Sequence, residues 1–558
     1  MKQRLSDYVA DFLVDHGVTD CFTVVGGGAM HLNDALGHKQ GLKCTYNHHE
    51  QASAIAAEAY ARIHNKIAAL CVTTGPGGTN AITGVVGGWL DSIPMFVLSG
   101  QVRYDTTARY AMQFTGGLPL RAVGDQEFDI TRSVGCMCKY AAMPAPVQKE
   151  TVQQVAELIK NAKRPVLYAG NGIRLSGGFE KFREVVEKLG VPVVTSWDSL
   201  DLIEDDHPLY CGRGGNMGDR PGNFAVQNAD LVLAVGIRLS IRQVGYDWKT
   251  WARAAKVVMV DVDPAELKKP TLHIDLPVCA DAKDFLTALE TAIAGEALPL
   301  NPQQGWRELC ESWKKNYPVV LPRHWAENGK TANCYAFIRY VGEAAPAGTL
   351  AVTSNGTCCV AGNQCYCIKP GTRFINNNAI ASMGYGLPAA IGACIANGRK
   401  DTICLEGDGS IMMNLQELQT VVTNRLPLKL FLINNDGYHS IRQTQNNLFK
   451  EHCKVGIGPE SGDLSFPSFE KIAGAFELPY YSAHSNAEMK AAVDKALAQE
   501  GPVFCEIFVD TQQVFEPKSA TKRLPDGTLV SPPLEDLAPF LPREELESIM
   551  QIPLMDEV

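Results

Sequence analysis

The sequence has no excess of basic residues and no long apolar run. Its 558 residues include 51 Lys and Arg against 61 Asp and Glu, a formal net charge of −10. This balance argues against a nucleic-acid-binding surface or an anionic-membrane binder, since both need basic faces. No window approaches the roughly 18 uninterrupted apolar residues of a membrane span. The first residues lack the apolar core and cleavage site of a signal peptide, so we expect no secretion signal.

The sequence also lacks any CxxC pair, although it contains 17 cysteines. Their spacings are irregular, with CxC at Cys136–Cys138 and Cys365–Cys367 and an adjacent pair at Cys358 and Cys359. This usage favours reduced thiols buried in a cytoplasmic protein. A zinc or iron–sulfur site is the alternative.

Short apolar runs alternate with helical patterns, which is typical of parallel sheets covered on both faces. The pattern restarts twice, and therefore predicts an α/β protein with three doubly wound parallel-sheet domains at residues 1–150, 151–325 and 326–515. Residues 516–558 are rich in proline and are expected to form a tail that wraps the body. Ser6 is expected to cap the first helix. The expected strands include residues 21–25, 68–73, 94–99, 165–169, 229–235, 257–262, 349–353, 402–405 and 428–433.

The most informative motif lies in the third domain. The strand at 402–405 runs into Glu406-Gly407-Asp408-Gly409-Ser410, and the strand at 428–433 ends in Asn434-Asn435-Asp436-Gly437. Twenty-four residues separate Gly409 from Asn434, enough for one βαβ crossover. Both polar clusters then lie at the carboxyl ends of parallel strands, where α/β sheets bind ligands. Asp408, Asn435 and the Gly437 carbonyl supply the hard oxygens that Mg²⁺ prefers, and N–H groups near Gly409 suit a phosphate.

A GDG turn alone is a common tight turn, but this arrangement resembles the GDG…NN motif of thiamine diphosphate (ThDP) enzymes. Three further segments, at residues 47–51, 74–80 and 381–392, occur in the order typical of the acetolactate synthase group. The resemblance covers nearly the whole chain. It implies successive pyrimidine-binding, central and diphosphate-binding domains.

The resemblance implies a role for individual residues. Glu50 would bond the aminopyrimidine ring and promote activation of the cofactor, the Ala381 carbonyl would receive the 4′-amino group, and Met383 would support the bent cofactor. Mg²⁺ would be held by Asp408, Asn435 and Gly437. The remaining cofactor-binding positions would be Pro76, Asn80, Gly356, Thr357, Gly409, Ser410 and Tyr438.

The resemblance also implies the reaction and the assembly. A 2-oxo acid, most simply pyruvate, would be decarboxylated and its two-carbon unit transferred to a carbonyl acceptor. C–C bond hydrolysis, simple decarboxylation and a non-catalytic homologue are the alternatives. Because Glu50 and Asp408 belong to different domains, the family builds each site between two subunits. A homodimer would be the smallest active unit, and homotetramers are frequent.

Flavin binding stays open at this stage. In acetolactate synthases the central domain carries FAD, and the segments containing Gly170, Arg238, Arg242 and Asp261 resemble the family's flavin segments. Arginines suit a pyrophosphate, and an aspartate at a strand end suits a ribose. Relatives without FAD keep similar glycines, so both outcomes remain.

Several segments depart from a typical acetolactate synthase. The region of residues 103–124 is longer by roughly a dozen residues, and Asn355 begins an unusual diphosphate-side loop. Residues 440–445 and 522–527 are similar to relatives from lipopolysaccharide and unusual-sugar biosynthesis. That similarity adds a nucleotide-linked keto sugar to the possible acceptors. The candidate substrate contacts are Gln113, Phe114, His439 and Arg442. For His439 and Arg442 the alternative is a solvated surface charge.

Overall fold

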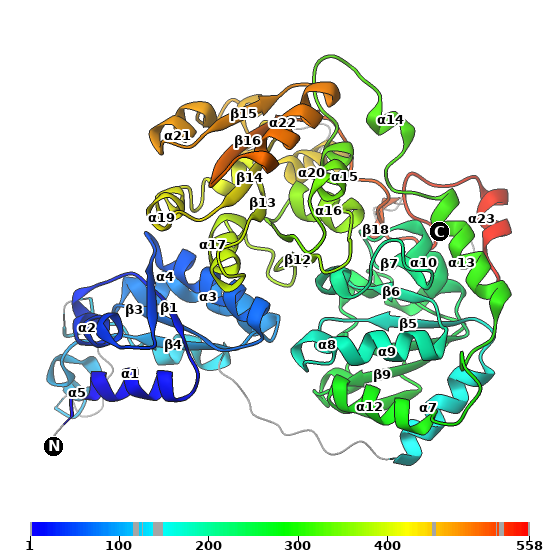
Figure 1. Cartoon of the computed structure of the whole chain (residues 1–558), viewed down its shortest axis with the longest axis horizontal. Helices are drawn as coiled ribbons and strands as arrows, with labels where there is room; N and C mark the ends of the chain where they lie inside the picture. Colours follow the sequence, from blue (N-terminus) through cyan, green and yellow to red (C-terminus); the bar gives the residue numbers. More distant parts are fainter. Residues whose placement is uncertain are drawn as a thin grey trace.

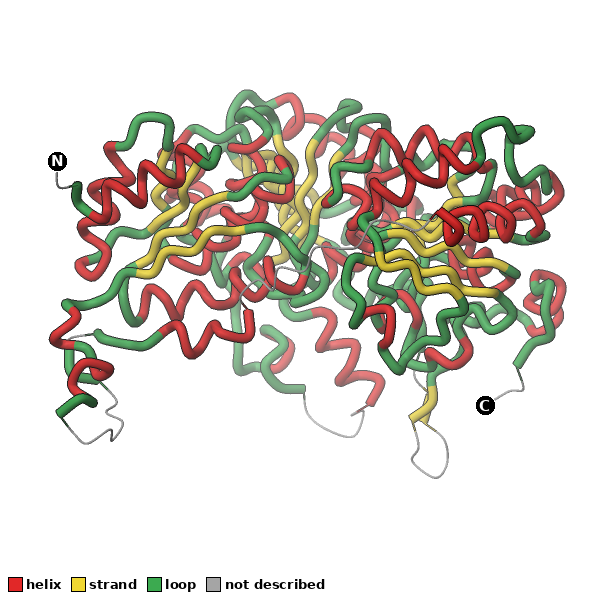
Figure 2. Tube along the Cα trace, turned by 90° about the horizontal axis from the view of Figure 1, so that it is seen from below, coloured by secondary structure: helices red, strands yellow, loops and turns green. Residues whose placement is uncertain are grey.

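A computed structural model describes residues 3–114, 122–124, 126–137, 149–448, 454–520, 522–523 and 529–555. Its helices and strands form three parallel α/β sheets, one in each third of the chain, as Figures 1 and 2 show. Every strand pair within these three sheets is parallel. The predicted fold class is therefore confirmed.

The N-terminal sheet has four strands in the order β2-β1-β3-β4. The first helix begins at Leu5 with the extended Arg4 as its cap, and Ser6 lies buried inside the first turn. The prediction that Ser6 caps this helix is wrong. The strands are β1 (Asp20–Thr23), β2 (Lys43–Tyr46), β3 (Ala68–Val72) and β4 (Met95–Ser99), and the helices are α1 (Leu5–Asp15), α2 (Met30–His38), α3 (Glu50–His64), α4 (Pro76–Leu90), α5 (Ala108–Ala111) and α6 (Ile130–Val134).

The central sheet has six strands in the order β10-β9-β8-β5-β6-β7. The strand order reverses between β5 and β8, so their carboxyl ends form the switch point of this sheet. The strands are β5 (Pro165–Ala169), β6 (Val193–Thr195), β7 (Tyr210–Arg213), β8 (Leu231–Val235), β9 (Lys256–Asp261) and β10 (Leu276–Cys279). The helices are α7 (Lys149–Asn161), α8 (Gly172–Leu175), α9 (Phe179–Leu189), α10 (Arg220–Asn228), α11 (Ile241–Val244), α12 (Ala282–Ala292) and α13 (Gln304–Asn316).

The C-terminal sheet has six strands in the order β12-β11-β13-β14-β16-β15. Its strands are β11 (Leu350–Thr353), β12 (Arg373–Ile375), β13 (Thr402–Gly407), β14 (Leu428–Asn434), β15 (Tyr480–Ala483) and β16 (Val503–Phe508). Its helices are α14 (Pro322–Trp325), α15 (Cys334–Ala344), α16 (Thr357–Cys365), α17 (Gly386–Ala396), α18 (Asp408–Ile411), α19 (Glu417–Asn424), α20 (His439–Leu448), α21 (Phe469–Ala475) and α22 (Asn486–Ala498).

The tail returns to the central domain. After the short pair β17 (Lys522–Arg523) and β18 (Leu529–Val530), helix α23 (Arg543–Ile549) lies beside α10 and α13 in Figure 1. Leu534, Leu537 and Leu546 are buried in the same apolar cluster as Phe224 and Trp313 of those two helices. Residues 524–527 of the motif expected in this tail lie outside the described residues.

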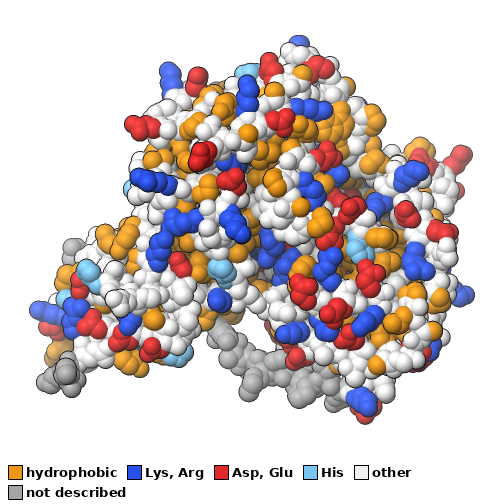
Figure 3. All heavy atoms as spheres, viewed as in Figure 1, with side chains coloured by type: hydrophobic (Ala, Val, Ile, Leu, Met, Phe, Trp, Pro, Cys, Tyr) orange, Lys and Arg blue, Asp and Glu red, His pale blue; other side chains and the backbone are white. Residues whose placement is uncertain are grey.

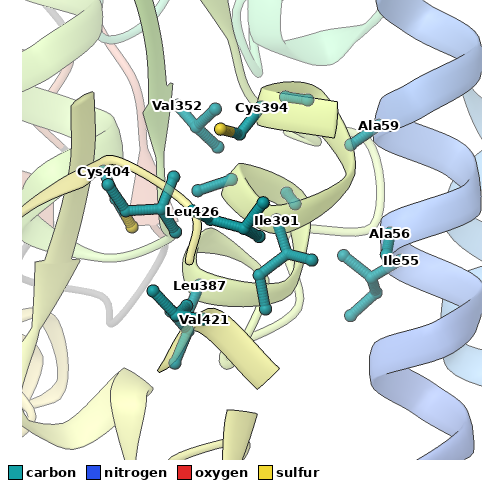
Figure 4. Packing of buried hydrophobic residues seen from close by; sticks show 14 of the residues in the cluster. Ile55, Ala56, Ala59, Val352, Leu387, Ile391, Cys394, Cys404, Val421 and Leu426 are labelled. Atoms are coloured by element: carbon teal, nitrogen blue, oxygen red, sulfur yellow. The ribbon is translucent and has the colours of Figure 1, made fainter. Parts of the chain in front are cut away.

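The N-terminal and C-terminal domains share one apolar core, built around the contact between α3 and α17. Figure 4 shows Ile55, Ala56 and Ala59 of α3 facing Ile391 of α17. Both helices are rich in alanine, and a Cβ on Gly392 of α17 would lie 2.0 Å from the Ala56 carbonyl oxygen. Small side chains let the two backbones approach closely. Glu50, the first residue of α3, is thus anchored to a helix of the other domain.

Acidic and basic side chains are interspersed over the face shown in Figure 3. Among the described residues, no helix is long and apolar enough to cross a membrane. The described cysteines are all free, and within the same residues no group of three or more His, Cys, Asp or Glu side chains is placed to hold a metal ion.

Candidate active site

The first half of the site lies in the N-terminal domain. Glu50 opens α3 directly after the β2 loop, and the Asn80 side-chain amide donates a hydrogen bond of 3.0 Å to its carboxylate. Asn80 lies in the first turn of α4, and Pro76 is the first residue of that helix. Because the first N–H groups of a helix have no partner within it, the Glu50 carboxylate lies near the positive end of α4.

The second half lies where β13 and β14 end. The N–H groups of Gly409 and Gly437 donate to the two oxygens of Asp408, at 2.7 and 2.8 Å. The Asn435 side chain donates to the Thr357 hydroxyl at the start of α16, at 2.9 Å. The structure thus brings together these polar residues from three strand ends, and burial raises the pKa of Asp408 to about 7.

Backbone conformation fixes this loop. Gly437 has φ of 118°, and a Cβ there would lie 2.0 Å from the Ile457 carbonyl oxygen. A Cβ on Gly409 would lie 2.4 Å from the ring of Tyr438. Glycine is therefore required at both positions, which brings the two polar turns close to each other. Gly356 precedes α16 with φ of 82° and has open space around it.

The loop between β12 and α17 carries two further predicted residues. Ala381 has φ of 53°, and the Met383 side chain is 41% exposed. The loop is held from the turn after β13, because the Gly384 N–H donates to the Ser410 hydroxyl at 2.8 Å. Asn355 donates to the Ser382 carbonyl at 2.7 Å. The unusual Asn355 thus supports the Met383 loop, and Met383 projects from a fixed backbone.

Three buried residues near the site were missed by the sequence analysis. Glu406, with a pKa raised to about 7 by burial, accepts from the Leu387 N–H at the start of α17 at 3.0 Å. Asn414 and Glu417 contact the loop that leads to Glu50. Glu406 adjoins the GDG turn, which could have drawn attention to it. No local pattern indicated the contacts of the other two.

His439 and Arg442 are not solvated surface charges. Arg442 is 1% exposed; it pairs with Glu460 and donates to the carbonyls of Asn435 and Asp436 at 2.9 and 2.6 Å. The buried His439 ring bonds the Gln513 carbonyl at 2.6 Å, and burial lowers its pKa. The bonds of Arg442 favour a supporting role for the turn at Asn435 and Asp436, while its contact with a substrate stays a prediction.

The two other candidate substrate residues follow α5. Phe114 is 73% exposed and packs edge-on against Tyr110, and Gln113 beside it is exposed. Residues 115–121 of the longer segment at 103–124 lie outside the described residues. Gln113 and Phe114 take no part in the hydrogen bonds described above for the site. That they contact the substrate stays a prediction.

The four candidate flavin residues lie around the central switch point. A Cβ on Gly170 would lie 2.2 Å from the Gly236 carbonyl oxygen, so this glycine lets the loops after β5 and β8 touch. Arg242 lies over the ring of Trp197, 5.0 Å from its centre. The Arg238 carbonyl accepts from Lys269. Asp261 ends β9, and burial raises its pKa to about 6.

Comparison with known proteins places these features in a family. Three models of thiamine pyrophosphate enzymes match: the N-terminal TPP binding domain at residues 3–116, the central domain at 152–289 and the C-terminal TPP binding domain at 354–507. Acetolactate synthase 1, chloroplastic, of Zea mays is 30% identical, covering 90% of this chain and 86% of the relative. The chain belongs to the thiamine pyrophosphate enzymes.

Other relatives of this ThDP enzyme are similar. Acetolactate synthase isozyme 2 large subunit of Escherichia coli is 29% identical over 96% of this chain and 100% of the relative. Acetolactate synthase, chloroplastic, of Arabidopsis thaliana is 28% identical over 91% of this chain and 82% of the relative. The relationship to acetolactate synthases is thus borne out at about 30% identity. These relatives give no support to the narrower resemblance to sugar-biosynthesis enzymes.

Proposed function

We propose that the chain is a ThDP-dependent carboligase that decarboxylates a 2-oxo acid, in the simplest case pyruvate, and joins the two-carbon unit to a carbonyl acceptor. In this reaction pyruvate loses CO₂, a bond forms to the acceptor carbonyl carbon, and a proton ends on the acceptor oxygen. The observation that carries the proposal is the polar turn of Asp408, Asn435 and Gly437, together with Glu50 held by Asn80.

The donor set fits Mg²⁺ with a diphosphate. Asp408 is a buried carboxylate whose bonded partners are two N–H groups, and burial raises its pKa. A divalent cation bound to Asp408 and the Asn435 side-chain oxygen would supply a positive charge next to this carboxylate. Thr357 and Gly356 would offer the start of α16 to the diphosphate.

The chain's own residues then divide the work. ThDP, when bound, supplies a carbon nucleophile and an electron sink. Glu50 would hold a proton at the aminopyrimidine ring, with Asn80 fixing the orientation of its carboxylate. Met383 would support the cofactor from a loop that Ser410 and Asn355 hold in place. Such preorganisation places the reacting groups before the chemical step.

The acceptor decides between related reactions. A second 2-oxo acid, a small aldehyde or ketone, or a nucleotide-linked keto sugar would each give a carboligase. C–C bond hydrolysis or simple decarboxylation to an aldehyde would follow if water or a proton took the place of the acceptor. The products of pyruvate incubated alone and with each acceptor, identified by mass spectrometry, distinguish these reactions.

The central domain fits a bound FAD. Thr195 Oγ1, Trp197 Nε1 and Asn216 Oδ1 are buried at the ends of β6 and β7 without a hydrogen-bond partner among the described residues. The Asn216 N–H donates to the Arg242 carbonyl at 2.9 Å, so these atoms adjoin a predicted flavin residue. Buried polar atoms without partners are costly unless a ligand or water meets them. A flavin absorption band in the purified protein tests this point.

Two copies would complete the site. Met383, Met412 and Met413 are large apolar side chains exposed around the cofactor loops. Contiguous exposed apolar residues favour a covered surface. We therefore expect a homodimer or homotetramer, in which Glu50 of one copy faces Asp408 and Asn435 of another. Light scattering measures the mass of the assembly.

The decisive experiment is Glu50→Gln. We expect pyruvate consumption with ThDP and Mg²⁺ to fall by about 100-fold or more, because proton transfer at a positioned group contributes about 10²- to 10⁴-fold. The exposed Glu488→Gln is the control and should behave as the unchanged chain. Unchanged turnover of pyruvate by Glu50→Gln, or no consumption of pyruvate with any acceptor by the unchanged chain, would overturn the proposal.

A further inference from the structure

Glu417, from the C-terminal domain, forms hydrogen bonds with the loop that precedes Glu50. Its carboxylate accepts from the Asn47 side-chain amide at 3.0 Å and from the His48 N–H at 2.9 Å. The Thr420 hydroxyl, one turn later in α19, donates to it at 2.7 Å. Glu417 and Asn47 are both buried. The carboxylate therefore has two separate bonds to one loop of the other domain.

Asn414, from the same segment, also contacts this loop. The Asn414 side-chain oxygen lies 3.3 Å from the His49 ring nitrogen, and its amide donates to the Gly384 carbonyl at 2.8 Å. Asn414 thus connects the residue before Glu50 with the residue after Met383. We propose that Glu417, assisted by Asn414, is a positioning residue that sets the direction of the Glu50 carboxylate.

The location of Glu50 explains why such a contact is needed. Glu50 follows β2, an edge strand with two of its four side chains exposed. Its own domain holds the start of the following loop, because the Asn47 N–H donates to the Thr23 carbonyl at 3.0 Å, whereas the next N–H, that of His48, is bonded from the other domain by Glu417. Hydrogen bonds to an ionised acceptor are about twice as strong as neutral ones. Two of them to successive residues fix both the position and the direction of the loop.

The inference rests on the proposed function, in which Glu50 acts on ThDP. If the Asp408 and Asn435 that face Glu50 come from a second copy, the segment from Asp408 to Glu417 contributes to two sites. Its start contacts the cofactor of one site, and its end positions the Glu50 that serves the other site. Each chain would then link the two sites of a dimer through one short segment.

The experiment compares Glu417→Gln with Thr420→Val in the full-length chain loaded with ThDP and Mg²⁺. A glutamine places an NH₂ group against an N–H donor of the loop, so one of the two bonds is lost. The valine removes a donor to Glu417 and leaves both bonds to the loop. The measurement is the rate at which the C2 proton of bound ThDP exchanges with deuterium, followed by NMR, alongside the dissociation constant of ThDP.

We expect Glu417→Gln to slow this exchange by about 10- to 100-fold, since a small misplacement of a reacting group costs about that much. The ThDP dissociation constant should stay close to that of the unchanged chain, and Thr420→Val should exchange normally. A residue that only supported the fold would lower the melting temperature without slowing exchange at saturating ThDP. If Glu417→Gln fails to fold, Asn47→Ala, on the other side of the same contact, decides the question.

Glu50→Gln separates the two failures. If exchange is normal in Glu50→Gln, the proposed function fails. If exchange is slow in Glu50→Gln but normal in both Glu417→Gln and Asn47→Ala, the proposed function stands and the positioning role is wrong.

Discussion

Glu50 and Asp408 each follow the carboxyl end of a parallel strand, but the two strands differ in their surroundings. Strand β13, before Asp408, lies between β11 and β14 and is almost entirely buried. Strand β2, before Glu50, lies at the edge of a four-stranded sheet. Asp408 is accordingly held by N–H groups of its own domain, whereas the Glu50 loop is held by Glu417 from another domain.

The opposite edge of the N-terminal sheet shows the same contrast. Strand β4 has an apolar sequence typical of a sheet interior, yet among the described residues it pairs with β3 alone, and Val97 is 41% exposed. The C-terminal sheet covers its apolar strands on both faces, and Val352 of β11 is 0% exposed. Much of the stability of the N-terminal domain must therefore come from the α3–α17 contact rather than from its own sheet.

The largest effect is expected at the interior position. Asp408→Asn removes the charge that would bind Mg²⁺, and we expect at least a 100-fold loss of Mg²⁺ affinity, since even the partners of metal ligands are worth about 10- to 100-fold. Titration calorimetry with ThDP and Mg²⁺ measures it. Without metal, the asparagine removes a buried charge but its NH₂ group faces one of the two N–H donors that bond Asp408, so we expect a folded variant of somewhat lower stability, checked by circular dichroism.

The neighbouring Asp436→Asn is the matched control. Asp436 is exposed and its φ of 57° suits asparagine, so Mg²⁺ affinity should change little. Equal losses in the two variants would show that general negative charge, rather than coordination by Asp408, attracts the metal.

The next largest effect is on stability, and it is measured by replacing one valine with threonine in each of the two sheets. Val352→Thr buries a hydroxyl in the C-terminal sheet and should lower the free energy of unfolding by about 1–3 kcal/mol. Val97→Thr places the same group on the half-open β4, where surface changes stay within about 0.5 kcal/mol. Urea denaturation of both variants measures the difference. Equal costs would mean that β4 is covered in the protein in solution, and the contrast between the sheets would be lost.

The sequence was sufficient to predict that the turns after β13 and β14 lie at one edge of a parallel sheet. The turns after β13 and β14 are local in sequence, and alternation of strand and helix determines which sheet edge they share. The three sheets followed from the same alternation. Helix ends were less certain: serine is a common capping residue, but the extended Arg4, two residues before Ser6, is the cap of α1.

The contacts between domains could not be predicted in this way. Asn47 and Glu417 are 370 positions apart, and nothing in the residues around either one indicates the other. Arg442 has a polar sequence context typical of an exposed helix face. It is nevertheless buried, because the carbonyls of Asn435 and Asp436 and the carboxylate of Glu460 accept its N–H groups. Such contacts depend on how complete domains pack, which periodicity does not encode.

The smallest effect concerns the junction of the three domains. Asp198 accepts from Asn378 of the C-terminal domain, and burial together with the nearby Asp91 raises its pKa to about 7, against the opposing charges of Arg62, Arg238 and Arg242. A carboxyl whose pKa is raised on folding contributes stability at low pH, and this contribution is lost as the pH rises through about 7. Asp198→Asn should therefore raise the free energy of unfolding at pH 8 by on the order of 1 kcal/mol and have little effect or destabilise at pH 5. Melting temperatures of both proteins across this range measure it. If the gain in stability of Asp198→Asn is the same at both pH values, Asp198 is ionised throughout this range. The nearby arginines would then fully compensate its charge.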